Sequence, residues 1–266
     1  MRNTGKRGLP YNSDNYTLPW SLSGQNSQVS WAYNWYSAGS SGINGQETSN
    51  PALTYIPMLW SNSPDLVNVW PTNAQQAIRN GADAILAFNE PDACWPGSGC
   101  MSVNDSVRAY RNYIQPFAGQ AKLGAPAVTN VGLDWLDQFL GNCTGCTIDF
   151  VPIHWYSNVY AFGYLQSVVQ SAYQVILKHY PEGRPIWLTE FGILDGTGGT
   201  EAQIEAFLQQ ALPWLDAVPY VDRYAWFMDA PGFLINANRS GLSQQGLIYN
   251  SYTAPCSNWN NTAGTC

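Results

Sequence analysis

Short apolar runs alternate with longer amphipathic stretches from residue 6 to residue 227. Apolar runs of about four to eight residues between turn residues are typical of buried strands, whereas the stretches between them have apolar residues at helical spacing. Eight runs are predicted to be strands: 6–9, 29–35, 55–60, 84–88, 122–125, 149–154, 186–189 and 220–227.

Start signals predict the helices between these runs. Two pairs fit the capping box, in which a Ser or Thr and a Gln or Glu three residues later bond each other's backbone. The pairs are Thr72 with Gln75 and Thr200 with Gln203. Further helices are predicted up to about residue 117, capped by Ser102 or Asn104, and over 132–140 and 166–180.

This alternation predicts the fold class. Eight strands separated by helices over 266 residues favour an α/β fold, a single-domain (β/α)8 TIM barrel, over an open doubly wound sheet. Neither Gly-x-Gly-x-x-Gly nor a Walker-type loop occurs, so the sequence offers no phosphate cradle. Within the domain 1–266, residues 230–266 follow the last strand, and we expect them to form a C-terminal flanking segment closed by a disulfide.

Composition narrows the class of partner. Hydrophobic residues make up 45% of the chain and charged residues only 11%, against about 25% in an average soluble domain. The net charge is −7 and the sequence has no basic cluster, which argues against nucleic acid and anionic membrane surfaces. No stretch approaches the roughly 20 apolar residues of a membrane span. A neutral polymer is the expected partner.

The six cysteines fall into three close pairs: Cys94 with Cys100, Cys143 with Cys146, and Cys256 with Cys266. This spacing suggests three local disulfides and an oxidising compartment, although spacing alone does not fix the connectivity. A redox role for the Cys143-x-x-Cys146 pair is the weaker alternative.

Glycosylation sequons support the same compartment. They begin at Asn15, Asn104, Asn142, Asn238 and Asn260. We expect the mature form of a secreted, extracellular glycoprotein, without its signal peptide, that acts as a monomer.

Two of the six glutamates follow an apolar run directly. Glu90 ends "AILAFNE" and Glu190 ends "PIWLTE". Parallel strands of a barrel carry their carboxyl ends to one rim, so the two carboxylates are predicted to meet there, as a two-carboxylate mechanism requires. Pro91 should end the first of these strands and hold Glu90 at the rim. The alternative for either residue alone is a solvated side chain on that rim.

These motifs resemble a known family. The resemblance is carried by five motifs, in chain order "KRGLPYN", "PMLW", "LAFNEPD", "HWY" and "WLTEFG". The chain resembles clan A glycoside hydrolases, and glycoside hydrolase family 128 most of all. The resemblance implies a β-1,3-glucanase that retains anomeric configuration and cleaves internally. It implies Glu90 as the acid/base, Glu190 as the nucleophile and Asn89 as the partner of the sugar 2-hydroxyl. The β-1,3 linkage rests on this resemblance alone.

Aromatic and polar residues near predicted strand ends are candidates for substrate binding. His154 and Tyr156 share a strand face and could bond Glu190 or a sugar hydroxyl. Aromatic faces stack on pyranose rings, which makes four tryptophans candidates. Trp35 and Trp226 are expected on the glycone side, and Trp60 or Trp95 at a flanking subsite. For each, the alternative is ordinary packing.

The sequence predicts neither a metal site nor a cofactor. It has only two histidines, and neither is near the Cys143–Cys146 pair in sequence. A clan A β-1,4-glucanase or mannanase is the alternative enzyme, and a non-catalytic β-glucan-binding barrel is the alternative from another class. A structural wall protein is weaker, because that role needs no acids at strand ends.

Overall fold

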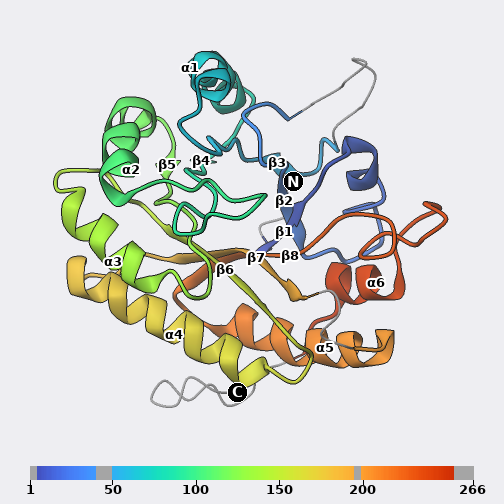
Figure 1. Ribbon diagram of the computed structural model, residues 1–266. Coiled ribbons are helices and arrows are strands. Elements are labelled where there is room, and N and C mark those ends of the chain that lie inside the picture. Colours follow the sequence, from blue (N-terminus) through green and yellow to red (C-terminus); the bar gives the residue numbers. More distant parts are fainter. Residues whose placement is uncertain (1–4, 40–49, 195–198, 255–266) are drawn as a thin grey trace.

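The computed structural model describes residues 5–39, 50–194 and 199–254 (Figure 1). Parallel strands form the centre, and helices surround them (Figure 1). The strands of the described residues are β1 (Arg7–Pro10), β2 (Val29–Tyr33), β3 (Thr54–Tyr55), β4 (Ala84–Ile85), β5 (Lys122–Leu123), β6 (Val151–Ser157), β7 (Ile186–Ile193) and β8 (Val221–Trp226).

The helices of the same residues follow the predicted alternation. They are α1 (Pro64–Arg79), α2 (Val103–Ala109), α3 (Leu133–Asn142), α4 (Phe162–His179), α5 (Glu201–Ala217) and α6 (Gln244–Ser251). A π-helical turn (Tyr110–Ile114) and a 3-10 turn (Gln115–Phe117) continue α2 to the predicted end at residue 117, and another 3-10 turn spans Asp14–Thr17.

Helix starts confirm two predicted caps and correct one. The Thr200 capping box forms, and the Ser102 side chain accepts a hydrogen bond from the Asp105 amide. The capping box predicted at Thr72 is wrong, because that residue lies inside α1. This helix begins at Pro64, whose fixed φ suits a first helical turn and whose missing N–H costs nothing there.

Strand pairing is parallel throughout but forms two sheets. Six strands pair in the order β3-β2-β1-β8-β7-β6, and β4 pairs with β5. Isolated parallel bridges, Met58 with Leu86 and Gly124 with Phe150, connect this pair to the two edges of the larger sheet. The mixed α/β class with a parallel sheet is therefore confirmed, whereas the assigned ladders do not by themselves form a closed eight-stranded barrel.

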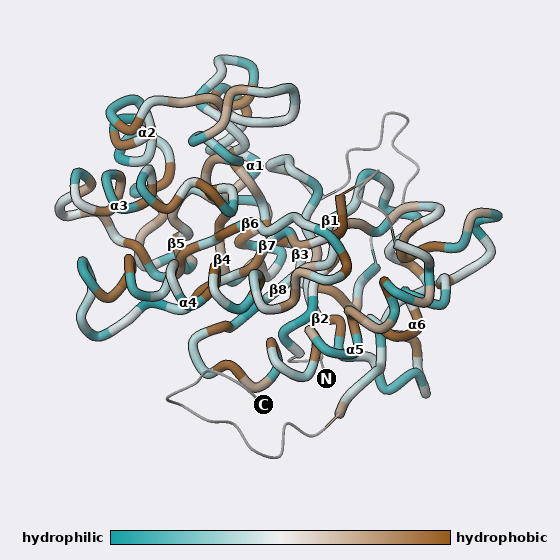
Figure 2. Tube along the Cα trace, turned by 60° about the horizontal axis from the view of Figure 1, so that its bottom comes forward, coloured by the Kyte–Doolittle hydropathy of each residue, from teal (hydrophilic) through white to brown (hydrophobic). Residues whose placement is uncertain are grey.

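The hydrophobic core has an outer and an inner part. The outer part packs the helices against the strands, and in α3 and α4 hydrophobic and hydrophilic segments alternate along the tube, as expected of helices with one buried face (Figure 2). The inner part is a separate, aromatic-rich cluster that includes Trp31, Phe150 and Trp187. It fills the space below the site described in the next section.

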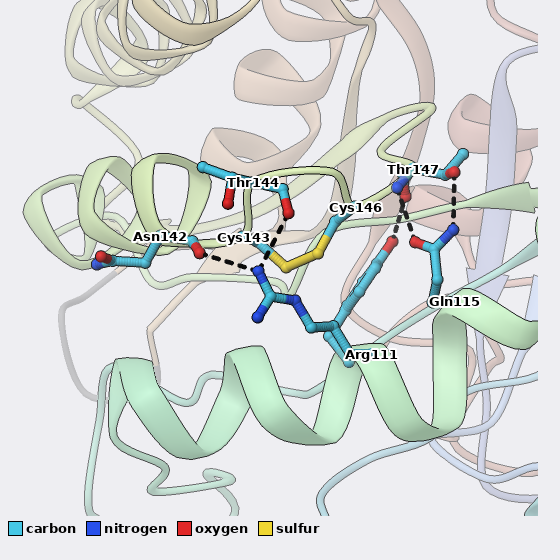
Figure 3. The surroundings of a disulfide bond; sticks show 8 residues. Arg111, Gln115, Asn142, Cys143, Thr144, Cys146 and Thr147 are labelled. Atoms are coloured by element: carbon cyan, nitrogen blue, oxygen red, sulfur yellow. Dashed lines mark hydrogen bonds between the residues drawn. A yellow bond between two sulfur atoms is a disulfide. The ribbon is translucent and has the colours of Figure 1, made fainter.

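The Cys143–Cys146 disulfide closes the loop between α3 and β6 (Figure 3). Arg111 donates to the two carbonyls that flank Cys143, and Gln115 exchanges two side-chain hydrogen bonds with Thr147 (Figure 3). The predicted pairing is confirmed. Its setting is that of a structural crosslink, because Cys143 is buried.

The described part of the C-terminal segment is built into the core. The fully buried Tyr249 in α6 donates through its hydroxyl to the Gly8 carbonyl at 2.8 Å, and Arg7 donates to the Tyr249 carbonyl at 2.8 Å. The predicted Cys256–Cys266 pair lies outside the described residues. None of the described helices is long and apolar enough to cross a membrane.

Candidate active site

Glu90 follows β4 and adopts an uncommon backbone conformation. Its φ is 44°, in the left-handed region that non-glycine residues rarely occupy. The Glu90 amide donates to the Ala127 carbonyl at 2.8 Å, and the Glu90 carbonyl accepts from the Ala93 amide at 3.2 Å. Strained backbone of this kind concentrates at functional sites. Here it turns the chain sharply at the carboxyl end of the strand and holds the Glu90 side chain at the rim.

Glu190 lies within β7, where three donors surround its carboxylate. Oε1 accepts from Trp35 Nε1 at 2.7 Å and from the Tyr33 hydroxyl at 3.3 Å, while Oε2 accepts from the Tyr156 hydroxyl at 2.6 Å. Burial and the charge on Glu190 raise the pKa of both tyrosines well above the usual range, so they remain donors. Donors on both oxygens hold the carboxylate in one orientation.

His154 connects the two glutamates. It pairs in register with Glu190 across β6 and β7, at a register shift between residues 153 and 154. Its Nδ1 lies 2.8 Å from Glu90 Oε1 and 3.5 Å from Glu190 Oε2, and its Nε2 lies 3.1 Å from Thr189 Oγ1. Burial alone lowers the pKa of His154, but attraction to Glu190 and the hydrogen bond to Glu90 outweigh it and raise the pKa overall. The site therefore favours a protonated His154 between the two glutamate side chains.

The three groups are close enough to act together. One oxygen of Glu90, one oxygen of Glu190 and a nitrogen of His154 all lie within 4.8 Å of one another. Such a cluster could hold a cation, but both Glu190 oxygens already accept hydrogen bonds from Trp and Tyr donors. The spacing is nearer to the ~5–5.5 Å of retaining glycosidases than to the ~6.5–9.5 Å of inverting ones.

A cavity of ≈ 760 Å³ opens above this cluster. Its walls combine aromatic rings with amides and the two glutamates, a mixture suited to sugar rings with polar edges. The lining residues comprise Asn12, Trp35, Trp60, Asn89, Glu90, Trp95, Gly97, Thr129, Asn130, Val131, Tyr156, Glu190, Leu194, Phe227 and Met228.

The structure brings most of the predicted site residues together. Both glutamates, Asn89, Tyr156 and three of the four predicted tryptophans line the cavity. Trp35 contacts Glu190 directly, Trp60 follows β3, and Trp95 is 53% exposed.

Two residues predicted to bind substrate, Trp226 and His154, do not line the cavity. Trp226 is only 2% exposed and packs against Phe191 and Phe207, because β8 directs this side chain outward toward α5. Its neighbours Phe227 and Met228, joined by a cis peptide bond, line the cavity instead. His154 is fully buried beneath the glutamates, so it contacts Glu90 rather than a sugar hydroxyl.

Sequence reasoning missed several groups. Tyr33 precedes Trp35 by two positions, so strand alternation could have placed both on one face. Thr189 precedes the predicted nucleophile and forms a hydrogen bond with His154, a contact that no sequence pattern predicts. Nor did a signal point to Phe227 and Met228, which lie where the predicted last strand ends.

The loop after Glu90 is fixed by the predicted Cys94–Cys100 disulfide, which the structure confirms. Asn89 Nδ2 donates to the Gly97 carbonyl at 3.2 Å, and the Gly99 amide donates to the Asn89 carbonyl at 2.7 Å. Asn89 Oδ1 is buried and has no hydrogen-bond partner among the described residues. The loop thus fixes the Asn89 amide and presents Trp95 at the cavity edge.

Two carboxylates at the carboxyl ends of parallel strands, under a cavity walled by tryptophans, are the features of a glycoside hydrolase. The chain belongs to the glycosyl hydrolase catalytic core family, whose model matches residues 8–250, and to glycoside hydrolase family 128.

Solved members of family 128 are similar over nearly the whole chain. A curdlan-specific exo-β-1,3-glucanase from Blastomyces gilchristii (subgroup III) has 32% identity and a TM-score of 0.78, over 95% of this chain and 100% of that one. An endo-β-1,3-glucanase from Sorangium cellulosum (subgroup II) has 25% identity and a TM-score of 0.74, over 92% and 97%. One from Amycolatopsis mediterranei (subgroup I), in complex with laminaritriose, has 28% identity and a TM-score of 0.69, over 94% and 98%.

Among curated proteins, the chain is similar to alkali-sensitive linkage protein 1 of Schizosaccharomyces pombe, with 31% identity over 260 residues. The match covers 92% of this chain but 44% of that protein, so the chain spans less than half the length of this relative.

Proposed function

We propose that the chain hydrolyses β-1,3-glucan with retention of anomeric configuration. The observation that carries this proposal is the close grouping of Glu90, His154 and Glu190, whose ligand atoms lie within 4.8 Å of one another. In the first step Glu190 attacks the anomeric carbon while Glu90 transfers its proton to the departing glycosidic oxygen. In the second step Glu90 takes a proton from water, and the resulting hydroxide displaces Glu190 from the sugar.

The surrounding groups give the two glutamates different roles. Trp35 and Tyr156 each donate to one oxygen of the Glu190 carboxylate, which orients it to attack as a nucleophile. His154 engages Oε1 of Glu90, which leaves Oε2 to exchange the proton with the leaving group and water. Asn89 Oδ1, buried and otherwise unpaired among the described residues, fits the 2-hydroxyl of the sugar that reacts.

The β-1,3 linkage is supported by relatives. The solved structures include an exo-acting enzyme from Blastomyces gilchristii and endo-acting enzymes from Sorangium cellulosum and Amycolatopsis mediterranei. For this chain we propose internal cleavage. An openly exposed Trp95 beside the cavity is consistent with a polymer that extends beyond it.

We also propose that the strands close into a (β/α)8 barrel, with α6 as a flanking element of one domain. The inner cluster takes residues from positions on or beside six strands: Trp31, Tyr33, Ile56, Met58, Ala84, Leu86, Phe150, Trp187 and Ala225. The other two strands supply glycines. A Cβ on Gly8 would lie 2.1 Å from the Trp31 ring, and one on Gly124 would lie 2.7 Å from the Phe150 ring. Positions on or beside all eight strands thus pack against the inner aromatic cluster.

An extracellular or cell-wall location is proposed as well. The two described disulfides support an oxidising compartment. The sequon asparagines Asn15, Asn104, Asn142 and Asn238 are all exposed, as glycosylation would require. Asn260 lies outside the described residues. The monomeric state and the absence of nucleic-acid and membrane partners stay predictions.

The experiment that tests this function compares Glu90→Gln and Glu190→Gln with the wild type. Reducing-sugar release from laminarin is measured, and products are separated by chain length. We expect short oligosaccharides from the wild type and at least about a 10³-fold loss in both variants.

Glu205→Gln, the same change at a partly exposed residue of α5 that does not line the cavity, is the matched control and should keep wild-type activity. Turnover of soluble cellulose or mannan without turnover of laminarin would replace the β-1,3 assignment. Binding to glucan without any product would identify a binding protein instead.

A further inference from the structure

Two exposed tyrosines lie at the start of α4, beyond the cavity wall. Tyr160 is 80% exposed and Tyr164 is 41% exposed, although aromatic rings are usually buried. Five of the nine large hydrophobic side chains exposed among the described residues are these two and three cavity-lining residues, Trp95, Val131 and Leu194. Exposed apolar groups are therefore concentrated at one opening rather than scattered.

Hydrogen bonds fix both tyrosine rings in place. The Tyr164 hydroxyl accepts from Asn130 Nδ2 at 2.9 Å, and Asn130 lines the cavity. The Tyr160 hydroxyl accepts from Gln203 Nε2 at 2.7 Å, and Gln203 Oε1 in turn accepts from the Thr200 amide at 2.9 Å. Gln203 of the α5 capping box thereby restrains the position of the Tyr160 ring. Rings fixed before binding lose little conformational entropy when a ligand covers them.

We propose that Tyr160 and Tyr164, called here the tyrosine shelf, form an outer binding surface for a β-glucan chain that extends out of the cavity. Aromatic faces bordered by the amides of Asn130 and Gln203 match pyranose rings, which have apolar faces and hydroxyl edges. Tyr164 joins the shelf to the cavity through Asn130, and neither tyrosine lines the cavity or contacts the two glutamates. The shelf therefore contributes to binding of long chains and not to the chemical step. This inference rests on the proposed function.

The test compares long and short substrates. Hydrolysis of curdlan and of laminaritriose is measured for the wild type, Tyr160→Ala and Tyr160→Phe, together with sedimentation binding to insoluble curdlan. For Tyr160→Ala we expect about a tenfold loss of curdlan binding and hydrolysis, since covering one exposed aromatic ring contributes on the order of that factor. Laminaritriose turnover should stay within about twofold. Tyr160→Phe retains the aromatic ring and should therefore keep at least about half of the wild-type binding and hydrolysis of curdlan.

Leu247→Ala is the control, because Leu247 is an exposed apolar residue (49%) on α6 that does not line the cavity. Equal curdlan binding by the wild type and Tyr160→Ala, with hydrolysis intact, would overturn the shelf and leave the proposed function standing. Equal losses on both substrates would also overturn it, because the residue would then support the cavity itself. A wild type that neither binds nor cleaves β-1,3-glucan would end both proposals. Binding without cleavage, lost in Tyr160→Ala, would retain the shelf alone.

Discussion

Single side chains around Glu190 differ in how closely they approach its carboxylate. The Tyr156 hydroxyl donates to Oε2 at 2.6 Å, whereas the Tyr33 hydroxyl is 3.3 Å from Oε1 and also donates to the Thr189 carbonyl at 3.0 Å. Loss of the Tyr156 hydroxyl leaves Oε2 with only the more distant His154 Nδ1, at 3.5 Å, among the described donors that the structure places near it. The two tyrosines therefore provide a comparison between a short and a long hydrogen bond to the same carboxylate.

We expect Tyr156→Phe to lower kcat by about ten- to a hundredfold and Tyr33→Phe to lower it less. A hydrogen bond to a charged group contributes about 1.5–3 kcal/mol, and 1.4 kcal/mol is a factor of about ten. Steady-state kinetics on laminarin, with circular dichroism to confirm folding, provides the measurement. An equal effect of the two changes would contradict the ranking by distance.

The protonation of His154 makes stability depend on pH. Burial lowers its pKa, but Glu190 and Glu90 outweigh this and raise the folded-state pKa above the ordinary 6.5. A raised pKa means that the folded chain binds the proton more tightly than the unfolded chain. The stabilisation is fully present below about pH 6.5 and is lost as the pH rises through the folded-state pKa.

We accordingly expect the free energy of unfolding to fall across that window, and to fall less in His154→Asn. Denaturant unfolding at a series of pH values measures the slope, and His179→Asn controls for the other histidine. Glu90→Gln, which removes one source of the shift, should give an intermediate slope. Identical slopes in the wild type and His154→Asn would refute the assignment.

Among the secondary-structure elements, α5 has the clearest local signal. Thr200 accepts from the Gln203 amide at 3.3 Å and donates its own amide to Gln203 Oε1 at 2.9 Å. The pair Thr72 and Gln75 has the same sequence pattern but lies inside α1, where backbone partners from the preceding turn replace the cap. A capping pattern therefore marks a helix start only when the preceding chain leaves the helix.

Thr200→Ala is expected to lower the free energy of unfolding by about 1 kcal/mol, the usual loss for an N-cap. Thr72→Ala, at an exposed position inside α1, should leave it unchanged or raise it by up to about 0.5 kcal/mol, because alanine is the better helix former. Urea unfolding of both variants would measure the difference. A larger loss at Thr72 would reverse the assignment of the two sites.

At the scale of the whole molecule, the fold depends on how β3, β4 and β5, which have short hydrogen-bonded ladders, pack around the inner aromatic cluster. Only two residues each of β3, β4 and β5 join a ladder, although the sequence predicts longer runs there. The chain beyond these short ladders is held by isolated bridges and by the inner aromatic cluster. Backbone hydrogen bonds outside the ladders, such as those from the Leu86 amide to the Pro57 carbonyl at 2.9 Å and from the Ala125 amide to the Phe150 carbonyl at 3.0 Å, connect this side of the sheet together with side-chain packing.

We expect Gly124→Ala to lower the free energy of unfolding by about 1–3 kcal/mol, the usual range for overpacking a core. Its Cβ would lie 2.7 Å from the Phe150 ring and 3.2 Å from the Ile85 carbonyl oxygen. Gly163→Ala is the control, since a Cβ there meets nothing within 4 Å and α4 should gain about 0.5–1 kcal/mol. Thermal unfolding would separate the two, and an unaffected Gly124→Ala would contradict the proposed packing of Gly124 against the inner aromatic cluster.

The sequence alone determined the order of strands and helices and the meeting of Glu90 with Glu190, and the cysteine spacing suggested the two pairs that the structure describes. These properties depend on local periodicity, on loop closure between near neighbours, and on the rule that parallel strands end at one edge. Each can be predicted from short local patterns in the sequence.

Only the tertiary structure decided which side chains face the cavity. Trp226 and Phe227 are adjacent, and a single step along β8 directs one into the outer core and the other to the substrate side. The burial of His154 and its contact with Thr189 depend on a register shift between β6 and β7. Such outcomes are set by packing between distant segments, because a shift of one residue reverses the face of every side chain that follows.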